Sequence, residues 1–538
     1  MRLAVTCRAS IRLAASRGNP IDDLAAASHA YEGGTGPGSR GHARGARRST
    51  GARDGGRLRA YKANPMTPRA LAPALLLALV PLPAPRAAPP AAAPAAAAAA
   101  TTPDLPFKMF KLANGLTVVV HEDHTNPIVG VHVQYDVGSK DEKPGRTGFA
   151  HLFEHLMFQG SEHLPKGLAD RLIEAAGGDT NGSTSQDTTQ YWAQAPSNAL
   201  EQMLYIESDR MGFLLPTLTQ DKLDNQRDVV RNERRQSYEM RPYGLAFEQI
   251  IGNLWNADFP YHWMAIGSHE DLQAASIEDV REFFKRFYGP ENAVLVVAGD
   301  VDTARLRALA ERWFGPVAGK PPPVHQKPDP VPLTEEKRVT MEDRVQLPRL
   351  YVAWQTPKVF APGDAALDLA GQILSDGKSA RLVKRLVMDE RIAQDVSAGQ
   401  MSQALGSMFL VTATPKPGVA LERLEKEIDE ELARLAAAPP TPEELERAKN
   451  KIEAGAIFGL EPVGGFGGRA ATLAGYYLRT GNPGFLGEDL ARYRTATGAD
   501  VSAAVRSFLR KDARVVLSVI PRAAPAGAPA PVGAKESR

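Results

Sequence analysis

The chain carries the same order of predicted strands and helices twice. In the first copy, residues 105–320, two apolar strands precede a short helix, two Thr-rich strands, two long helices, and a closing helix and strand. The second copy, residues 338–523, repeats this order, beginning with the apolar strand "RLYVAWQTP". An internal duplication of this size predicts two homologous α+β domains, each a mixed or antiparallel sheet covered by helices.

Segments of low complexity separate and flank the two predicted domains. Residues 321–337 are Pro-rich and form a linker between them, and residues 89–104 are an Ala/Pro-rich tether before the first. Residues 524–538 form a second Ala/Pro-rich stretch, predicted to be a tail. None of these segments has enough large apolar residues to build a core.

The N-terminal region has the composition of an export signal preceded by an unusual extension. Residues 1–65 are rich in Arg and Gly, which predicts a disordered extension or a segment that does not belong to the native protein. Met66 and Arg69 then precede a short apolar run and small residues, so residues 66–88 are predicted to be a signal peptide. We therefore expect a mature protein that begins near Ala88, is periplasmic or secreted, and has no transmembrane span. The alternative is that the segment is retained as an uncleaved anchor.

Charge and cysteine content exclude several kinds of partner and site. The chain has 64 basic and 62 acidic residues and a formal net charge of +2, so nothing indicates nucleic acid as a partner. The single cysteine, Cys7, can form no internal disulfide and cannot build a thiolate metal site. Any metal site in this chain therefore depends on histidines and carboxylates.

The stretch "HLFEHLMFQG", residues 151–160, places such groups in an apolar helix. On a helix, His151, Glu154 and His155 fall on one side. Two imidazoles one turn apart can ligate a single metal ion, most often zinc, and a neighbouring glutamate that is not a ligand can take a proton from activated water. The alternative is a polar stripe on a surface helix, which the flanking apolar residues disfavour. The second copy contains no histidine, so only the first domain can carry this chemistry.

Three stretches together resemble the pitrilysin-type inverzincin family of zinc peptidases, in particular its short bacterial two-domain members. They are "GFAHLFEHLMFQGS", "GGDTNGSTSQDTTQYW" and "NQRDVVRNERRQ", and the resemblance covers residues 105–523. It implies a zinc metalloendopeptidase with one Zn²⁺ per chain, half of a four-domain clamshell. The metal ligands it implies are His151, His155 and Glu233, with Glu154 as the catalytic base.

Without the resemblance, the sequence does not distinguish Glu233 from Glu207 or Glu239 as third ligand. Many family members carry a glutamate two turns before the third ligand, whereas this chain has Gln226. It is therefore in doubt whether this position helps to orient the metal ligands, as the glutamate of the relatives does. The equivalent of Glu233 in the second copy is Gly455, as expected for a domain without metal.

The resemblance also implies where substrate binds. The strand containing Asn181, Gly182, Ser183 and Thr184 is expected to receive an extended peptide as an added strand. Arg469 and Tyr476, seven residues apart on one predicted helix, are expected to hold the substrate carbonyl at the zinc of another chain. The expected assembly is a homodimer, or a heterodimer with a homologous subunit that lacks the metal motif.

Two further motifs are interpreted as structural, and two other function classes remain open. "HEDH", residues 121–124, ends a strand at a turn, and "GGFGGR", residues 464–469, lacks the strand–turn–helix setting of a phosphate loop.

A non-catalytic assembly subunit is one alternative function, although the intact motif argues against it. A zinc hydrolase acting on something other than peptides is the second, and substrate profiling would distinguish it.

Overall fold

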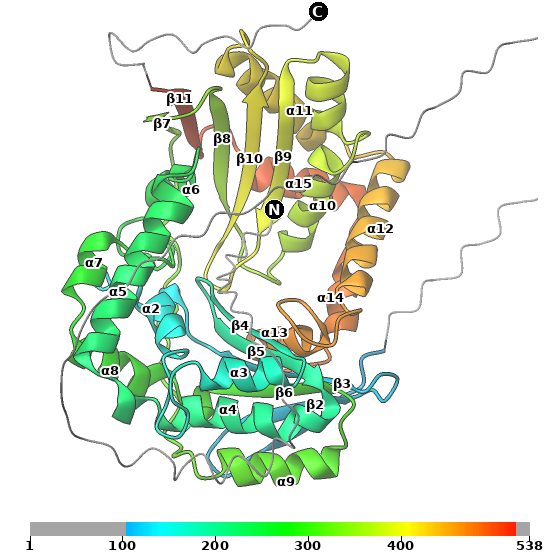
Figure 1. Ribbon diagram of the computed structural model, residues 1–538. Coiled ribbons are helices and arrows are strands. Elements are labelled where there is room, and N and C mark those ends of the chain that lie inside the picture. The colour runs from blue at the N-terminus through cyan, green and yellow to red at the C-terminus, as the bar shows by residue number, and fades with distance from the viewer. Residues whose placement is uncertain (1–103, 523–538) are drawn as a thin grey trace, which may run out of the picture. The chain divides into compact units, whose positions relative to one another are not determined.

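The computed structural model describes residues 104–522, which form two β-sheets with helices packed against them (Figure 1). The first sheet has the strand order β1-β2-β6-β3-β5-β4 and the second has the order β7-β11-β8-β10-β9. In each sheet one neighbouring pair is parallel, β2 with β6 and β7 with β11, and the other pairs are antiparallel. Two mixed sheets covered by helices confirm the predicted α+β class.

The first sheet is centred on a strand without any polar side chain, "AVLVVAG", every residue of which is buried. A strand that is apolar on both faces belongs in the middle of a covered sheet, and this strand pairs with a neighbour on each side. The strands of this sheet are β1 (Lys108–Lys111), β2 (Thr117–Glu122), β3 (Ile128–Tyr135), β4 (Asp179–Thr184), β5 (Thr189–Pro196) and β6 (Ala293–Gly299).

The helices of the first half pack mainly on one face of this sheet. Most were predicted, but the three helices Ala246–Leu254, His269–Ala274 and Thr303–Phe314 and the short strand β1 were not. The helices are α2 (Phe149–Leu156), α3 (Leu168–Ala175), α4 (Leu200–Phe213), α5 (Gln220–Arg234), α6 (Ala246–Leu254), α7 (His269–Ala274), α8 (Ile277–Phe287) and α9 (Thr303–Phe314).

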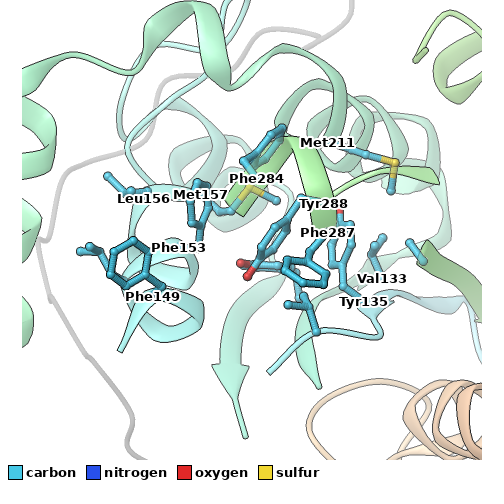
Figure 2. Packing of buried hydrophobic residues seen from close by; sticks show 14 of the residues in the cluster. Val133, Tyr135, Phe149, Phe153, Leu156, Met157, Met211, Phe284, Phe287 and Tyr288 are labelled. Atoms are coloured by element: carbon cyan, nitrogen blue, oxygen red, sulfur yellow. The ribbon is translucent and has the colours of Figure 1, made fainter. Parts of the chain in front are cut away.

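An aromatic cluster fixes α2 in the core beneath the first sheet (Figure 2). The ring of Phe153 lies 5.4 Å from that of Phe284 on α8 and 5.0 Å from that of Tyr288, and Tyr288 in turn lies 5.0 Å from Tyr135 on β3. Burying one large apolar side chain contributes roughly 1.5–3 kcal/mol. The apolar face of α2 is therefore held firmly, which fixes the direction of its polar face.

The second half repeats the arrangement with five strands and six α-helices among its described residues. Its strands are β7 (Lys337–Asp343), β8 (Arg349–Thr356), β9 (Ala393–Met401), β10 (Ser407–Pro415) and β11 (Val515–Pro521). Its helices are α10 (Asp364–Ser375), α11 (Leu421–Ala437), α12 (Pro442–Phe458), α13 (Arg469–Thr480), α14 (Leu486–Thr495) and α15 (Gly498–Phe508).

Each sheet is also covered by a helix from the other half of the chain. On α13, Ala470, Leu473 and Ala474 form a buried cluster with residues of β2 and β6 in the first sheet. Helix α6 of the first half packs reciprocally against β8 and β11 of the second sheet. The sequence predicted that helices cover each sheet but did not reveal this exchange, because nothing in the sequence of either helix shows that it packs on the sheet of the other half.

The predicted extension 1–65, the signal segment 66–88 and the tail 524–538 lie outside the described residues, as does the linker 89–104 except for its last residue. Among residues 104–522, no helix is long and apolar enough to cross a membrane.

Candidate metal centre

The polar face of α2 presents two imidazoles and a carboxylate next to the core. Phe149, Leu152, Phe153 and Leu156 form the buried apolar side of this helix. The side chains of His151 and His155 are only 12% and 14% exposed, and their ring centroids lie 4.8 Å apart.

Helix α5 packs against α2 and supplies the third group. This helix starts at the N-cap Thr219, whose side chain accepts a hydrogen bond from the amide of Lys222. Glu233 lies in its last turn, and its Oε2 atom is 3.3 Å from Nε2 of His155 and 3.8 Å from Nε2 of His151. One ligand atom from each residue lies within 4.8 Å of the others, and among the described residues no other such group occurs.

The structure distinguishes Glu233 from the two other glutamates that sequence reasoning left open. Glu207 is buried beside Arg210, with 3.1 Å between carboxylate and guanidinium. Glu239 lies 2.8 Å from His269 and pairs with Arg234. Neither belongs to the cluster, so the geometry favours Glu233.

The electrostatics of the three residues suit a cation between them. Burial lowers the pKa of His151 to about 4, which keeps its imidazole neutral and able to ligate. Burial acts to raise the pKa of Glu233, but the hydrogen bond to His155 and the two neighbouring imidazoles lower it overall. Burial acts to lower the pKa of His155, but Glu233 and Glu154 raise it overall. Two imidazoles and an ionised carboxylate form a donor set that fits zinc.

Glu154 lies beside the cluster and is not part of it. Burial raises the pKa of its carboxyl to about 7, against the opposing effect of hydrogen bonds from Thr184. A carboxyl with a pKa near neutrality is suited to taking up and releasing a proton.

Gln226, which stands where many relatives have a glutamate, lies on α5 two turns before Glu233. Its side chain is buried, and its amide nitrogen donates a hydrogen bond to Oδ1 of Asn225 at 2.8 Å.

The predicted substrate strand is an edge strand next to Glu154. Among residues 104–522, β4 pairs only with β5, so one side of its backbone has no strand partner there. A methyl group on the α-carbon of Gly182 would lie 3.3 Å from the Cγ atom of Glu154. The glycine therefore lets the strand approach the candidate base closely.

Arg469 and Tyr476 have polar partners within their own chain. The guanidinium of Arg469, in the first turn of α13, pairs with Asp123 after β2. The hydroxyl of Tyr476 donates to Asp489 on α14 with an oxygen–oxygen distance of 2.8 Å. Neither forms a hydrogen bond or ion pair with the His151, His155 and Glu233 cluster within residues 104–522.

The two motifs interpreted as structural have structural partners. In "HEDH", Nδ1 of His121 contacts the carbonyl of Pro106 and Nδ1 of His124 contacts Asp300, each at 2.8 Å. In "GGFGGR", the backbone of Gly464 packs on Gly130 of β3 and leads into α13.

Glu142, which supports the start of α2, was not predicted from the sequence. The N-cap of α2 is Gly148, which has no side chain to cap the helix. The buried carboxylate of Glu142 accepts hydrogen bonds from the amides of Gly148 and Ala150 at 3.0 and 2.8 Å. Only the lack of a capping side chain before the motif helix could have indicated this role.

Comparison with protein families gives two matches that together span most of the described chain. Residues 117–259 match the model of the insulinase family, peptidase family M16, and residues 274–452 match that of the M16 inactive domain. The metal cluster lies within the first match, and the second match falls largely in the half without histidines.

Individual relatives agree with these matches. The chain is 31% identical over 358 residues to the zinc protease PqqE of Helicobacter pylori, covering 65% of this chain and 79% of that protein. It is 24% identical over 371 residues to the mitochondrial-processing peptidase subunit beta of Saccharomyces cerevisiae, covering 65% and 78%. The solved structure of a protease from Helicobacter pylori matches with a TM-score of 0.72 and 27% identity, covering 77% of this chain and all of that one.

Proposed function

The chain belongs to the M16 family of peptidases, and on this basis we propose that it is a zinc-dependent metalloendopeptidase that hydrolyses extended peptides or unfolded polypeptide segments. The observation that carries the proposal is the convergence of His151, His155 and Glu233 on one point, with Glu154 beside them. Relatives that are named zinc proteases support a peptidase function, and the finer assignment rests on this geometry.

His151, His155 and Glu233 would hold one zinc ion per chain. When bound, zinc supplies Lewis acidity, which makes water more acidic and polarises a peptide carbonyl. Glu154 takes a proton from the attacking water at its carboxylate and then delivers it to the amine of the leaving peptide. Its raised pKa, about 7, matches both halves of this task near neutral pH.

The edge strand β4 supplies a binding site for an extended chain. A peptide that adds to this edge pairs its backbone with residues Asn181, Gly182, Ser183 and Thr184, and so runs alongside Glu154. Because the contacts are backbone contacts, they favour unfolded segments over compact proteins.

Arg469 and Tyr476 would act on a peptide bound at the metal centre of another chain. Within one chain their hydrogen bonds go to Asp123 and Asp489, away from the metal cluster. A homodimer is the simplest assembly that brings both parts together, since one chain carries both, and a partner without the metal motif is the alternative.

The test is the variant Glu154→Gln, assayed with a mixed peptide library and by zinc analysis. It keeps the shape of the side chain and removes the base, so zinc content should equal that of the parent while turnover falls by about two to four orders of magnitude. Glu162→Gln, at an exposed position shortly after α2, is the matched control and should leave turnover unchanged. Near-normal turnover in Glu154→Gln would exclude this carboxylate as the base.

A further inference from the structure

The metal centre depends on the relative placement of two helices that come from separate parts of the first domain. The two histidines lie on α2 and the glutamate lies on α5. A small rotation of either helix would separate Glu233 from the imidazoles, so some feature has to fix one helix against the other. Residues 263–271, here named the bridging segment, contact both helices.

The bridging segment holds the start of α2. The indole Nε1 of Trp263 donates to Glu142, the carboxylate that also accepts the amide of Gly148. Asp271 accepts hydrogen bonds from the amide and the hydroxyl of Thr147, at 2.9 and 2.6 Å. The residues just before α2 are therefore anchored at several points.

The same segment holds the end of α5. Nη1 of Arg234, the residue after the proposed ligand Glu233, donates to the carbonyl of Gly267 at 3.0 Å. Its Nη2 atom contacts both carboxylate oxygens of Glu248 on α6, at 2.9 and 2.8 Å. A further hydrogen bond joins Nε2 of His269 to Oε1 of Glu239, with 2.8 Å between the two atoms.

Gly267 is where the two sets of contacts meet. Its carbonyl oxygen accepts a hydrogen bond from Arg234. Its α-carbon packs so closely against Gly148 that a methyl group added to it would lie 2.5 Å from the α-carbon of Gly148. Both glycines have positive φ, +73° and +87°, a backbone conformation that other residues rarely adopt. A single residue thus contacts the N-terminus of α2 and the C-terminal turn of α5.

We propose that Arg234 and Gly267 are positioning residues that set Glu233 against His151 and His155, and so determine the affinity of the site for zinc. The inference rests on the proposed function, because it takes these three residues as the zinc ligands. Arg234 is suited to the role because its rigid, buried guanidinium bonds a backbone carbonyl and a carboxylate at once. Groups that orient metal ligands from outside typically change metal affinity by about 10–100-fold when removed.

The experiment compares zinc affinity, by chelator competition, in the full-length parent, Arg234→Met and Arg234→Lys. Arg234→Met should weaken zinc binding by about 10–100-fold and alter the absorption spectrum of bound Co²⁺, with a parental far-UV circular dichroism spectrum. Arg234→Lys should recover part of the affinity, because a lysine retains the charge and one donor direction. Arg235→Met, next along the chain at an exposed position, is the matched control and should bind zinc as the parent does.

A second variant keeps the test valid if Arg234→Met does not fold. Glu248 lies on α6 outside the proposed ligand set, and Glu248→Gln removes the nearer of the two carboxylate charges that pair with Arg234, so zinc affinity should fall by about threefold or more. Zinc affinity within twofold of the parent, with an unchanged Co²⁺ spectrum, in a folded Arg234→Met or Glu248→Gln protein would overturn the positioning role. A parent that binds no zinc would instead overturn the proposed function.

Discussion

Glu233 and Glu239 lie six residues apart, yet their neighbours differ. Glu233 faces two imidazoles, whereas Glu239 is paired with Arg234 and His269. We therefore expect Glu233→Ala to lose most of its bound zinc, because a site with two protein ligands holds the ion weakly. Glu239→Ala should keep at least most of the parental zinc content. Metal analysis of both purified variants is the measurement, and equal zinc content in Glu233→Ala and the parent would refute the ligand assignment.

His132 on β3 gives the protein a predictable response to acid. Its ring is fully buried, and burial lowers its pKa to about 4, whereas in the unfolded chain it titrates near 6.5. The unfolded state therefore binds more protons between these values, so stability is present above pH 6.5 and is lost as pH falls toward 4. The loss is about 3 kcal/mol over the whole interval.

The variant His132→Gln removes this titrating ring. Its urea unfolding free energy should fall less between pH 7 and pH 5 than that of the parent, with both proteins measured at saturating zinc so that the ligand histidines stay fixed. The same pH dependence in both proteins would show that His132 does not titrate in this interval.

The sequence predicted some residues of the candidate metal centre and left others undetermined, for a physical reason. His151, Glu154 and His155 were found because helical spacing places them on one face of a single element. Glu233 is distinguished from Glu207 only by what faces it across α2 and α5, which is a tertiary relation without a local pattern. Glu142 was missed because its role depends on a helix start several residues further along the chain.

Among the elements, β4 leads to a prediction that needs no protein variant. If peptides add to this edge as an antiparallel or parallel strand, alternate backbone amides of the peptide point toward it. N-methylation of those amides should raise KM by roughly threefold to tenfold each, since one hydrogen bond contributes about 0.5–1.5 kcal/mol. Methylation of the intervening amides should be tolerated.

The measurement is a scan of singly N-methylated versions of one cleaved peptide, at positions away from the scissile bond. An effect that repeats every second residue supports strand addition, and equal tolerance at all positions would argue for recognition by side chains alone.

The elements that sequence predicted are those with strong periodicity or unbroken apolar character. β6 is a run of buried apolar residues, and α8 has a Ser276 cap and charges at both ends that mark its limits. The packing of α6 and α13 was harder to predict, because nothing in their composition indicates which of the two similar sheets they cover. Only the folded chain shows that each packs on the sheet of the other half.

At the level of the whole molecule, the separation of Arg469 and Tyr476 from the metal cluster predicts complementation between chains. Glu154→Gln lacks the proposed base, and the double variant Arg469→Ala, Tyr476→Ala lacks the pair proposed to bind the substrate carbonyl, so each should be inactive alone. After equal mixing and subunit exchange, half of the dimers are mixed and each has one intact site, which restores about a quarter of the parental activity. Exchange without recovered activity, or a fully active monomer at assay concentration, would contradict the arrangement in trans.

The exchange of α6 and α13 between the two halves has a consequence for how the chain acquires its structure during synthesis. The buried strands β2 and β6 leave the ribosome long before α13, which covers them. At elongation rates of about 5–20 residues per second the delay is on the order of ten seconds or more, during which α13 cannot cover this apolar sheet face. We therefore expect the nascent N-terminal half to depend on a chaperone that binds exposed apolar surface until α13, Arg469–Thr480, has been synthesised.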